Sequence, residues 1–216
     1  MRTLLTGFGS FGHTVNNPSA RIVEHFARVG ATGHELTARV LPVSFGRAEH
    51  EIRGLLSSGR FEAAVLLGVA GREERIRLER FGRLRATDRT DVDGSLPANP
   101  ERVTSVPDCY HATVSLEQLF VELTAAGLPA RLSDDAGDYV CNHTYYATLE
   151  TIAVSSLPTR CLFVHVPPDA ETFAVPLDGP TLPLERQIAA VALILAWLIR
   201  GESVSSPDLE ASGAEA

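Results

Sequence analysis

The chain is poor in cysteine, and it lacks a basic run, a long hydrophobic stretch and an amino-terminal signal pattern. Its 216 residues include three cysteines, an odd number without metal-ligand spacing. Such usage suits a reducing compartment, so we expect a cytoplasmic protein. Residues 2–6 lead to a glycine before an apolar signal segment can develop. The longest apolar stretch, Ile188–Ile199, is too short to span a bilayer.

Acidic residues outnumber basic ones. The 27 Asp and Glu against 19 Lys and Arg give a formal net charge of -8. Because no basic cluster could neutralise phosphates, we expect neither a nucleic-acid partner nor an anionic membrane partner. A hydrophobic fraction of 44% fits one globular domain, which we expect over residues 1–200. The Ser/Glu/Ala-rich residues 201–216 are predicted to form a disordered tail.

Short apolar segments alternate with amphipathic ones along the chain. Strands are predicted at 2–6, 36–43, 61–68, 130–133 and 161–166, and helices at 18–29, 47–56, 116–126, 142–152 and 184–200. This alternation predicts an α/β fold, a three-layer α/β/α sandwich with a mostly parallel central sheet. Residues 71–107 are polar and weakly periodic, which indicates a long excursion with short strands and a hairpin.

One cysteine, Cys141, stands where the pattern becomes helical. A thiol at a helix N-terminus faces unpaired N–H groups and the positive end of the helix dipole, and both favour the nucleophilic thiolate. The alternative is a small core residue, because free cysteine is often buried. Cys109 and Cys161 are more typical of core thiols.

A cysteine nucleophile needs an imidazole, and the imidazole needs an orienting group. His165 lies in an apolar strand just before two prolines, where an unpaired ring would be costly, and we interpret it as the base. His143 is two residues from Cys141 and would point to another helix face, which indicates a structural role. The carboxylates that could orient the base follow the central strand, and the pattern does not choose among them: Glu73, Glu74 and Glu79.

Five short motifs follow one another in order: Thr6–Gly12 with Asn17-Pro18-Ser19, Leu41–Phe45, Gly68–Gly71 with Glu79-Arg80, Ala136–His143, and His165-Val166-Pro167. Together they resemble the pyroglutamyl peptidase I (pyrrolidone-carboxylate peptidase) family of cysteine peptidases, over nearly the whole length up to the tail. The resemblance implies an α/β/α sandwich, commonly a homotetramer. It also implies removal of an N-terminal pyroglutamyl residue from peptides, without a metal or cofactor.

The resemblance also implies roles for individual residues. Cys141 matches the nucleophile, His165 the general base and Glu79 the carboxylate that orients the imidazole. The residues that match the pocket for the lactam ring are Phe8 and Phe11, which pack on it, with Val43, Val69, Tyr139 and Val140. For the two phenylalanines, ordinary core packing is the alternative interpretation.

The sequence departs from the family between the central strand and residue 84. Val69 stands where the family usually has Gln, Arg72-Glu73 where it has Gly-Arg, and Gly82-Arg83-Leu84 where it has Ala-Ile-Asn. These changes predict a shifted substrate preference. Two alternatives stay open: a non-catalytic relative that binds pyroglutamyl or other lactam ligands, and a cysteine amidohydrolase of another cyclic amide.

Overall fold

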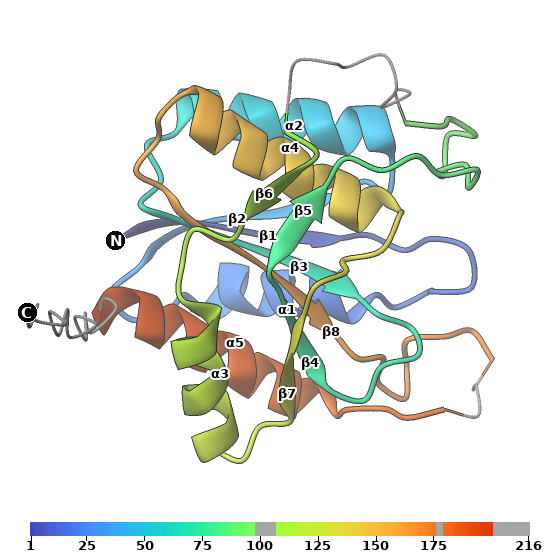
Figure 1. The fold of residues 1–216 in the computed structure, drawn as a ribbon. Helices are drawn as coiled ribbons and strands as arrows, with labels where there is room; N and C mark the ends of the chain where they lie inside the picture. Colours follow the sequence, from blue (N-terminus) through green and yellow to red (C-terminus); the bar gives the residue numbers. More distant parts are fainter. Residues whose placement is uncertain (98–106, 176–178, 201–216) are drawn as a thin grey trace, which may run out of the picture.

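A six-stranded sheet runs through the middle of the molecule, between two layers of helices (Figure 1). The computed structural model describes residues 1–97, 107–175 and 179–200, so the tail predicted for 201–216 lies outside the described residues. In spatial order the strands are β2 (Glu35–Leu41), β1 (Arg2–Phe8), β3 (Ala63–Val69), β8 (Arg160–Val166), β4 (Ile76–Glu79) and β7 (Ala130–Ser133). The first four are parallel, β4 is antiparallel to β8, and β7 is parallel to β4. The predicted α/β sandwich with a mostly parallel sheet is confirmed.

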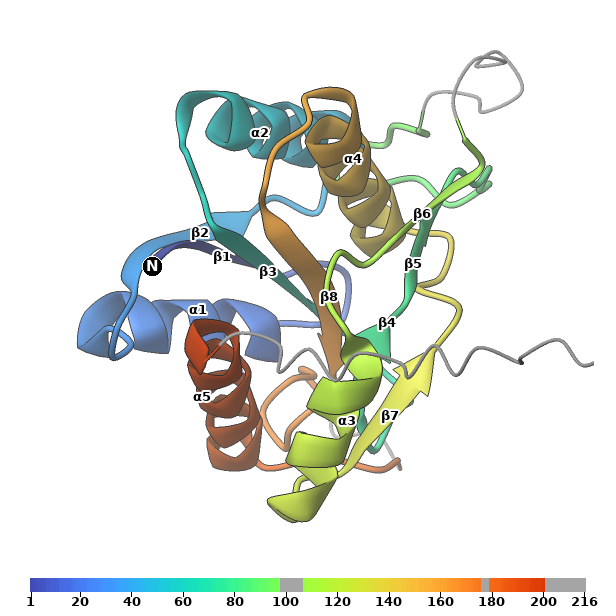
Figure 2. The same ribbon diagram turned by 60° about the vertical axis from the view of Figure 1, so that its left-hand side comes forward.

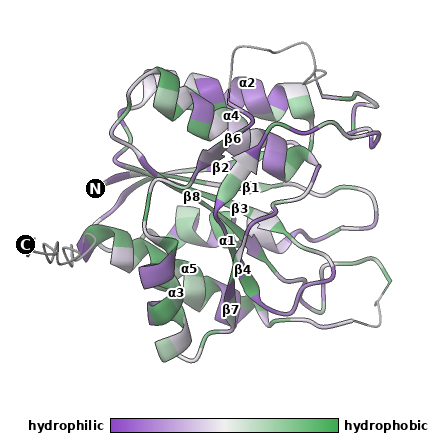
Figure 3. Cartoon of the chain, in the orientation of Figure 1, coloured by the Kyte–Doolittle hydropathy of each residue, from purple (hydrophilic) through white to green (hydrophobic). Residues whose placement is uncertain are grey.

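Helices cover both faces of this sheet. On one face lie α2 (Phe45–Ser58) and α4 (Val140–Val154), and on the other lie α1 (Pro18–Val29), α3 (Leu116–Ala125) and α5 (Leu184–Arg200), as Figures 1 and 2 show. Each face has its own buried apolar cluster, and the central strands and α5 are mostly hydrophobic in Figure 3. Burial of these two faces holds the sandwich together. Within the described ranges, no helix is both long and apolar enough to cross a membrane.

The Asn17-Pro18-Ser19 motif begins α1 and ties it to the end of β1. Asn17 is the N-cap, and its Oδ1 accepts the N–H of Ser19 at 3.1 Å. Its amide nitrogen donates to the carbonyl of Gly9 at 3.0 Å, and the N–H of Phe8 donates to Ser19 Oγ at 3.0 Å. This motif therefore fixes the turn at the carboxyl end of β1.

The long excursion after β3 differs from the prediction. Its first strand, β4, joins the central sheet, and β5 (Phe81–Arg83) pairs with β6 (Cys109–His111) in a separate two-stranded sheet. The short strands predicted inside residues 71–107 are therefore present, but the described part of that segment contains no hairpin, because the partner of β5 lies beyond it. Residues 98–106 of the excursion lie outside the described residues.

Candidate active site

The imidazole of His165 is held by a carboxylate from the neighbouring antiparallel strand. In the β4–β8 ladder Glu79 lies opposite Phe163, two residues from His165. Nδ1 of His165 lies 2.7 Å from Oε1 of Glu79. Glu79 is fully buried and His165 is 5% exposed. Such a bond fixes the ring and its tautomer, with Nε2 left for chemistry.

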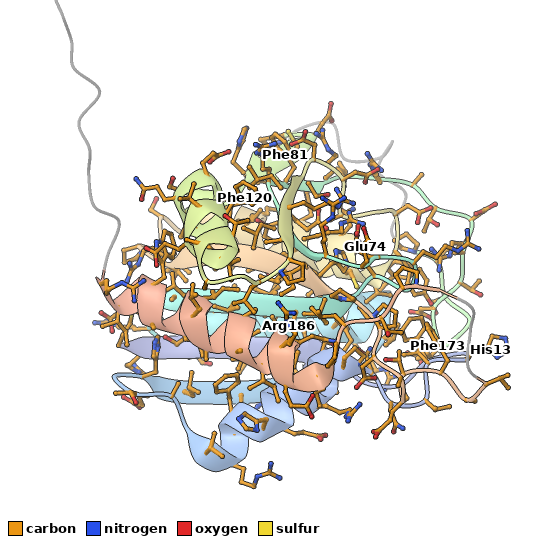
Figure 4. All side chains as sticks on the ribbon, turned by 90° about the horizontal axis from the view of Figure 1, so that it is seen from below. His13, Glu74, Phe81, Phe120, Phe173 and Arg186 are labelled. Carbon is orange, nitrogen blue, oxygen red and sulfur yellow. The ribbon has the colours of Figure 1, made fainter. Side chains whose placement is uncertain are left out.

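The other two carboxylates considered from the sequence point elsewhere. Glu73 lies 2.6 Å from Arg131, and Glu74 lies in the turn before β4 with its carboxylate 3.9 Å from Arg75 (Figure 4). Among the three, the structure therefore brings only Glu79 to His165.

Cys141 lies in the first turn of α4, which begins two residues before the predicted start of the helix. The chain reaches α4 from β7 through a loop that turns at Gly137, whose φ of 88° favours glycine. Tyr139 stands at the N-cap, and its side chain makes no capping hydrogen bond. The N–H groups of the first turn therefore lack helical acceptors and can serve an anion.

The sulfur of Cys141 occupies the space that a side chain on Gly68 would need. Gly68 lies opposite His165 in the β3–β8 ladder. A Cβ on Gly68 would lie 2.9 Å from Cys141 Sγ and 3.1 Å from His165 Cδ2. The thiol and the imidazole therefore meet over the bare backbone of this glycine.

The charges of the site act on His165. Burial by itself lowers its pKa, but hydrogen bonds to Cys141 and Glu79 and the charges of both raise it to about 9. At neutral pH the ring is therefore protonated and can donate to an anion. By contrast, burial raises the pKa of the Cys161 thiol well above its usual range, which makes that cysteine inert.

A cavity of about 700 Å³ opens over Cys141 and His165. Of the six residues that match the family's pocket, Phe11, Val69 and Tyr139 line it, and the Phe11 and Tyr139 rings lie 6.2 Å apart. The other three belong to the buried core cluster on the α2–α4 face of the sheet: Phe8, Val43 and Val140. They lie behind the cavity wall, so the structure does not bring them into the same lining.

A second hollow of about 780 Å³ adjoins the first and shares Phe11 with it. Arg72 and Phe173 line this hollow. His13 and Phe173 lie close together at this end of the molecule (Figure 4), where the N–H of Ala174 donates to the carbonyl of His13 at 3.2 Å. Two of the family departures, Val69 and Arg72, thus lie on the two adjoining hollows.

His143 turns away from the cavity. Its Nε2 lies 2.8 Å from Glu49 Oε2, and its ring packs edge-on against Phe45 of α2. Arg53 extends this contact between the helices, with its Nε 2.8 Å from Glu49 Oε1. The structural role predicted for His143 agrees with this geometry.

Arg77 is a site residue to which none of the sequence motifs points. Its Nη2 lies 2.9 Å from Glu79 Oε1, and it also lines the cavity. The available signal was its spacing of two from Glu79 in a short strand, which places both side chains on one face. Among the described residues, no group of three or more His, Cys, Asp or Glu could hold a metal ion.

Comparison with known proteins agrees with this geometry. A family model described as pyroglutamyl peptidase matches residues 1–200. The pyrrolidone-carboxylate peptidase of Thermococcus onnurineus is 34% identical over 197 residues, which cover 90% of this chain and 97% of the relative. That of Gloeobacter violaceus is 34% identical over 168 residues, or 77% and 82% of the two chains.

Solved structures of pyrrolidone carboxyl peptidases are also similar to this chain. The pyrrolidone carboxyl peptidase of Fervidobacterium islandicum AW-1 superposes with a TM-score of 0.86 at 32% identity and covers 93% of this chain and 99% of its own. The enzyme of Thermococcus litoralis gives 0.82 at 30% identity, with 90% and 91% covered. The chain belongs to the pyroglutamyl peptidase family of cysteine peptidases.

Proposed function

We propose that the chain is a cysteine exopeptidase that hydrolyses the amide bond after an N-terminal pyroglutamyl residue. Cys141 is the nucleophile, His165 the general base and Glu79 the carboxylate that orients the imidazole. The observation that carries this proposal is the alignment of the Cys141 sulfur and the His165 ring over Gly68, with Glu79 bound to Nδ1. Residues 1–200 form one peptidase domain in this proposal.

The reaction is an acyl transfer in two steps. The thiolate of Cys141 attacks the carbonyl carbon of the pyroglutamyl residue, and N–H groups at the start of α4 donate to the oxyanion. His165 gives its proton to the leaving amine as the C–N bond breaks, which leaves a thioester on Cys141. Water then loses a proton to His165 and attacks the thioester, and free pyroglutamate and the thiolate are regenerated.

The cavity suits a neutral five-membered lactam. The ring carries no free α-amine, so the site needs no anionic clamp. The faces of Phe11 and Tyr139 and the side chain of Val69 offer an apolar surface for it. In this proposal Phe8, Val43 and Val140 support that surface from behind.

The departures from the family favour a shifted preference on the leaving-group side. Val69 places an aliphatic side chain beside the nucleophile, and Arg72 adds a cationic side chain to the adjoining hollow. In this proposal that hollow receives the residues after the scissile bond.

Two further parts of the proposal rest on the family resemblance and on the cysteines. We propose a homotetramer, which light scattering on the purified chain would test. We also propose a cytoplasmic location, because the three cysteines are free thiols. Cell fractionation would test this part.

The decisive experiment is release of a fluorescent amine from its pyroglutamyl amide, by the wild type and by Cys141→Ser. We expect turnover by the wild type and a loss of at least about a thousandfold in the variant. His165→Ala should abolish activity, whereas His143→Ala, the matched control, should retain most of it. Lactam binding without turnover by the wild type would favour the non-catalytic alternative. Turnover unaffected by Cys141→Ser would remove Cys141 as nucleophile.

A further inference from the structure

Arg77 contacts the carboxylate of the proposed triad directly. It lies on β4 two residues before Glu79, and it pairs with His165 across the β4–β8 ladder. Its Nη2 lies 2.9 Å from Glu79 Oε1, the same oxygen that receives Nδ1 of His165. Oε1 of Glu79 therefore has two cationic partners, the guanidinium of Arg77 and the protonated ring of His165.

The same guanidinium nitrogen holds the loop that leads to the nucleophile. Nη2 donates to Ser133 Oγ at 2.9 Å and to the carbonyl of Asp135. The carboxylate of Asp135 accepts the N–H of Gly137 at 2.8 Å, four residues before Cys141. Arg77 thus joins the strand of the orienting carboxylate to the segment that positions the sulfur.

The charge of the site gives Arg77 a second effect. With a thiolate on Cys141, an imidazolium on His165 and a carboxylate on Glu79, the ionised triad carries one net negative charge. A buried net charge is costly, and the Arg77 side chain, 17% exposed, balances it. The other charged side chains that line the cavity have their own partners: Arg131 with Glu73, Arg89 with Asp138, Asp134 with Arg80, and Asp135 with Arg85.

We propose that Arg77 is a positioning residue of this reaction, which fixes the loop before Cys141 relative to Glu79 and balances the charge of the ionised triad. The inference rests on the proposed roles of Cys141, His165 and Glu79. Arg77 itself does not exchange a proton or an electron pair with the substrate.

The test is the pH dependence of kcat/KM on a pyroglutamyl amide of a fluorescent amine. The basic limb of this profile, where kcat/KM falls as His165 loses its proton, should move upward by about one pH unit in Arg77→Met. The reason is that the variant lacks a cation that opposes the imidazolium. The value at the optimum should fall about tenfold or more. Arg77→Lys keeps the charge and should keep the limb within about 0.3 units of the wild type. Arg77→Gln should show the same upward shift, and it replaces Arg77→Met if that variant does not fold.

Arg131→Met is the matched control. It removes the same charge from the residue opposite Arg77 on β7, but its carboxylate partner is Glu73. We expect no shift of the basic limb in this variant. An unshifted or lowered limb in folded Arg77→Met or Arg77→Gln would overturn the inference, since a merely structural arginine would lower the rate alone. An inactive wild type would instead overturn the proposed function.

Discussion

Replacing Gly68 by alanine should separate the nucleophile from the base. The added Cβ would lie 2.9 Å from Cys141 Sγ and 2.9 Å from Cζ of Phe163. Packed carbon and sulfur atoms lie roughly 3.5 Å apart or more, so the neighbours must give way by about half an ångström. Phe163 is fully buried in β8, so we expect Cys141, in the first turn of α4, to take most of the displacement.

The magnitude follows from the geometry of the reaction. A misplacement of about 1 Å costs about 100-fold in rate, so a displacement of about half an ångström should lower kcat/KM of Gly68→Ala by roughly tenfold. Overpacking against Phe163 should also lower the free energy of unfolding by about 1–3 kcal/mol. Initial rates on the pyroglutamyl amide measure the first effect, and urea unfolding measures the second.

Gly54→Ala is the matched control for this change. Gly54 lies in α2, and an added Cβ would meet no atom within 4 Å. Alanine there should leave kcat/KM unchanged and raise the unfolding free energy by about 0.5–1 kcal/mol, because it is the better helix former. If Gly68→Ala kept more than half of the wild-type kcat/KM, the sulfur could not depend on the space above Gly68, and the reasoning would be refuted.

Two further predictions concern charge. Glu79→Gln removes the negative charge that raises the pKa of His165. The basic limb of kcat/KM, near pH 9, should therefore move down by about one to two units. An unshifted limb would contradict the assignment of Glu79. Glu49→Gln should lower the unfolding free energy by about 1 kcal/mol at neutral pH, because the hydrogen bond from His143 lowers the pKa of Glu49 from 4.5 to about 2. The lowered pKa of Glu49 stabilises the fold above pH 4.5, and this stabilisation is lost as the pH falls toward 2. Urea unfolding should therefore show the unfolding free energies of the wild type and Glu49→Gln converging over that range. A constant difference would exclude this origin.

Local patterns in the sequence were enough for most of the regular structure. The helix at 184–200 and the strand at 130–133 have the predicted bounds, because each is long or apolar enough to be defined by its own periodicity. The membership of β4 in the central sheet was not predictable. It has four residues in a polar segment, and its place is set by pairing with β7 and β8.

The site residues also divide into those that the local sequence pattern marks and those that only the tertiary structure identifies. The helix entrance and the apolar strand marked Cys141 and His165 from their neighbours alone, whereas Glu79 was one of three carboxylates until the family resemblance favoured it. Its assignment rests on a 2.7 Å contact across two strands.

The sequence by itself determined which segments form strands and helices and which side chains have suitable chemistry. Only the tertiary structure decided which of them meet. The β4–β8 register brings Glu79 and Arg77 to His165, and the missing side chain of Gly68 lets the Cys141 sulfur reach the same ring. These contacts join residues far apart in the chain, so no local pattern encodes them, and burial in a close-packed interior is what fixes their distances.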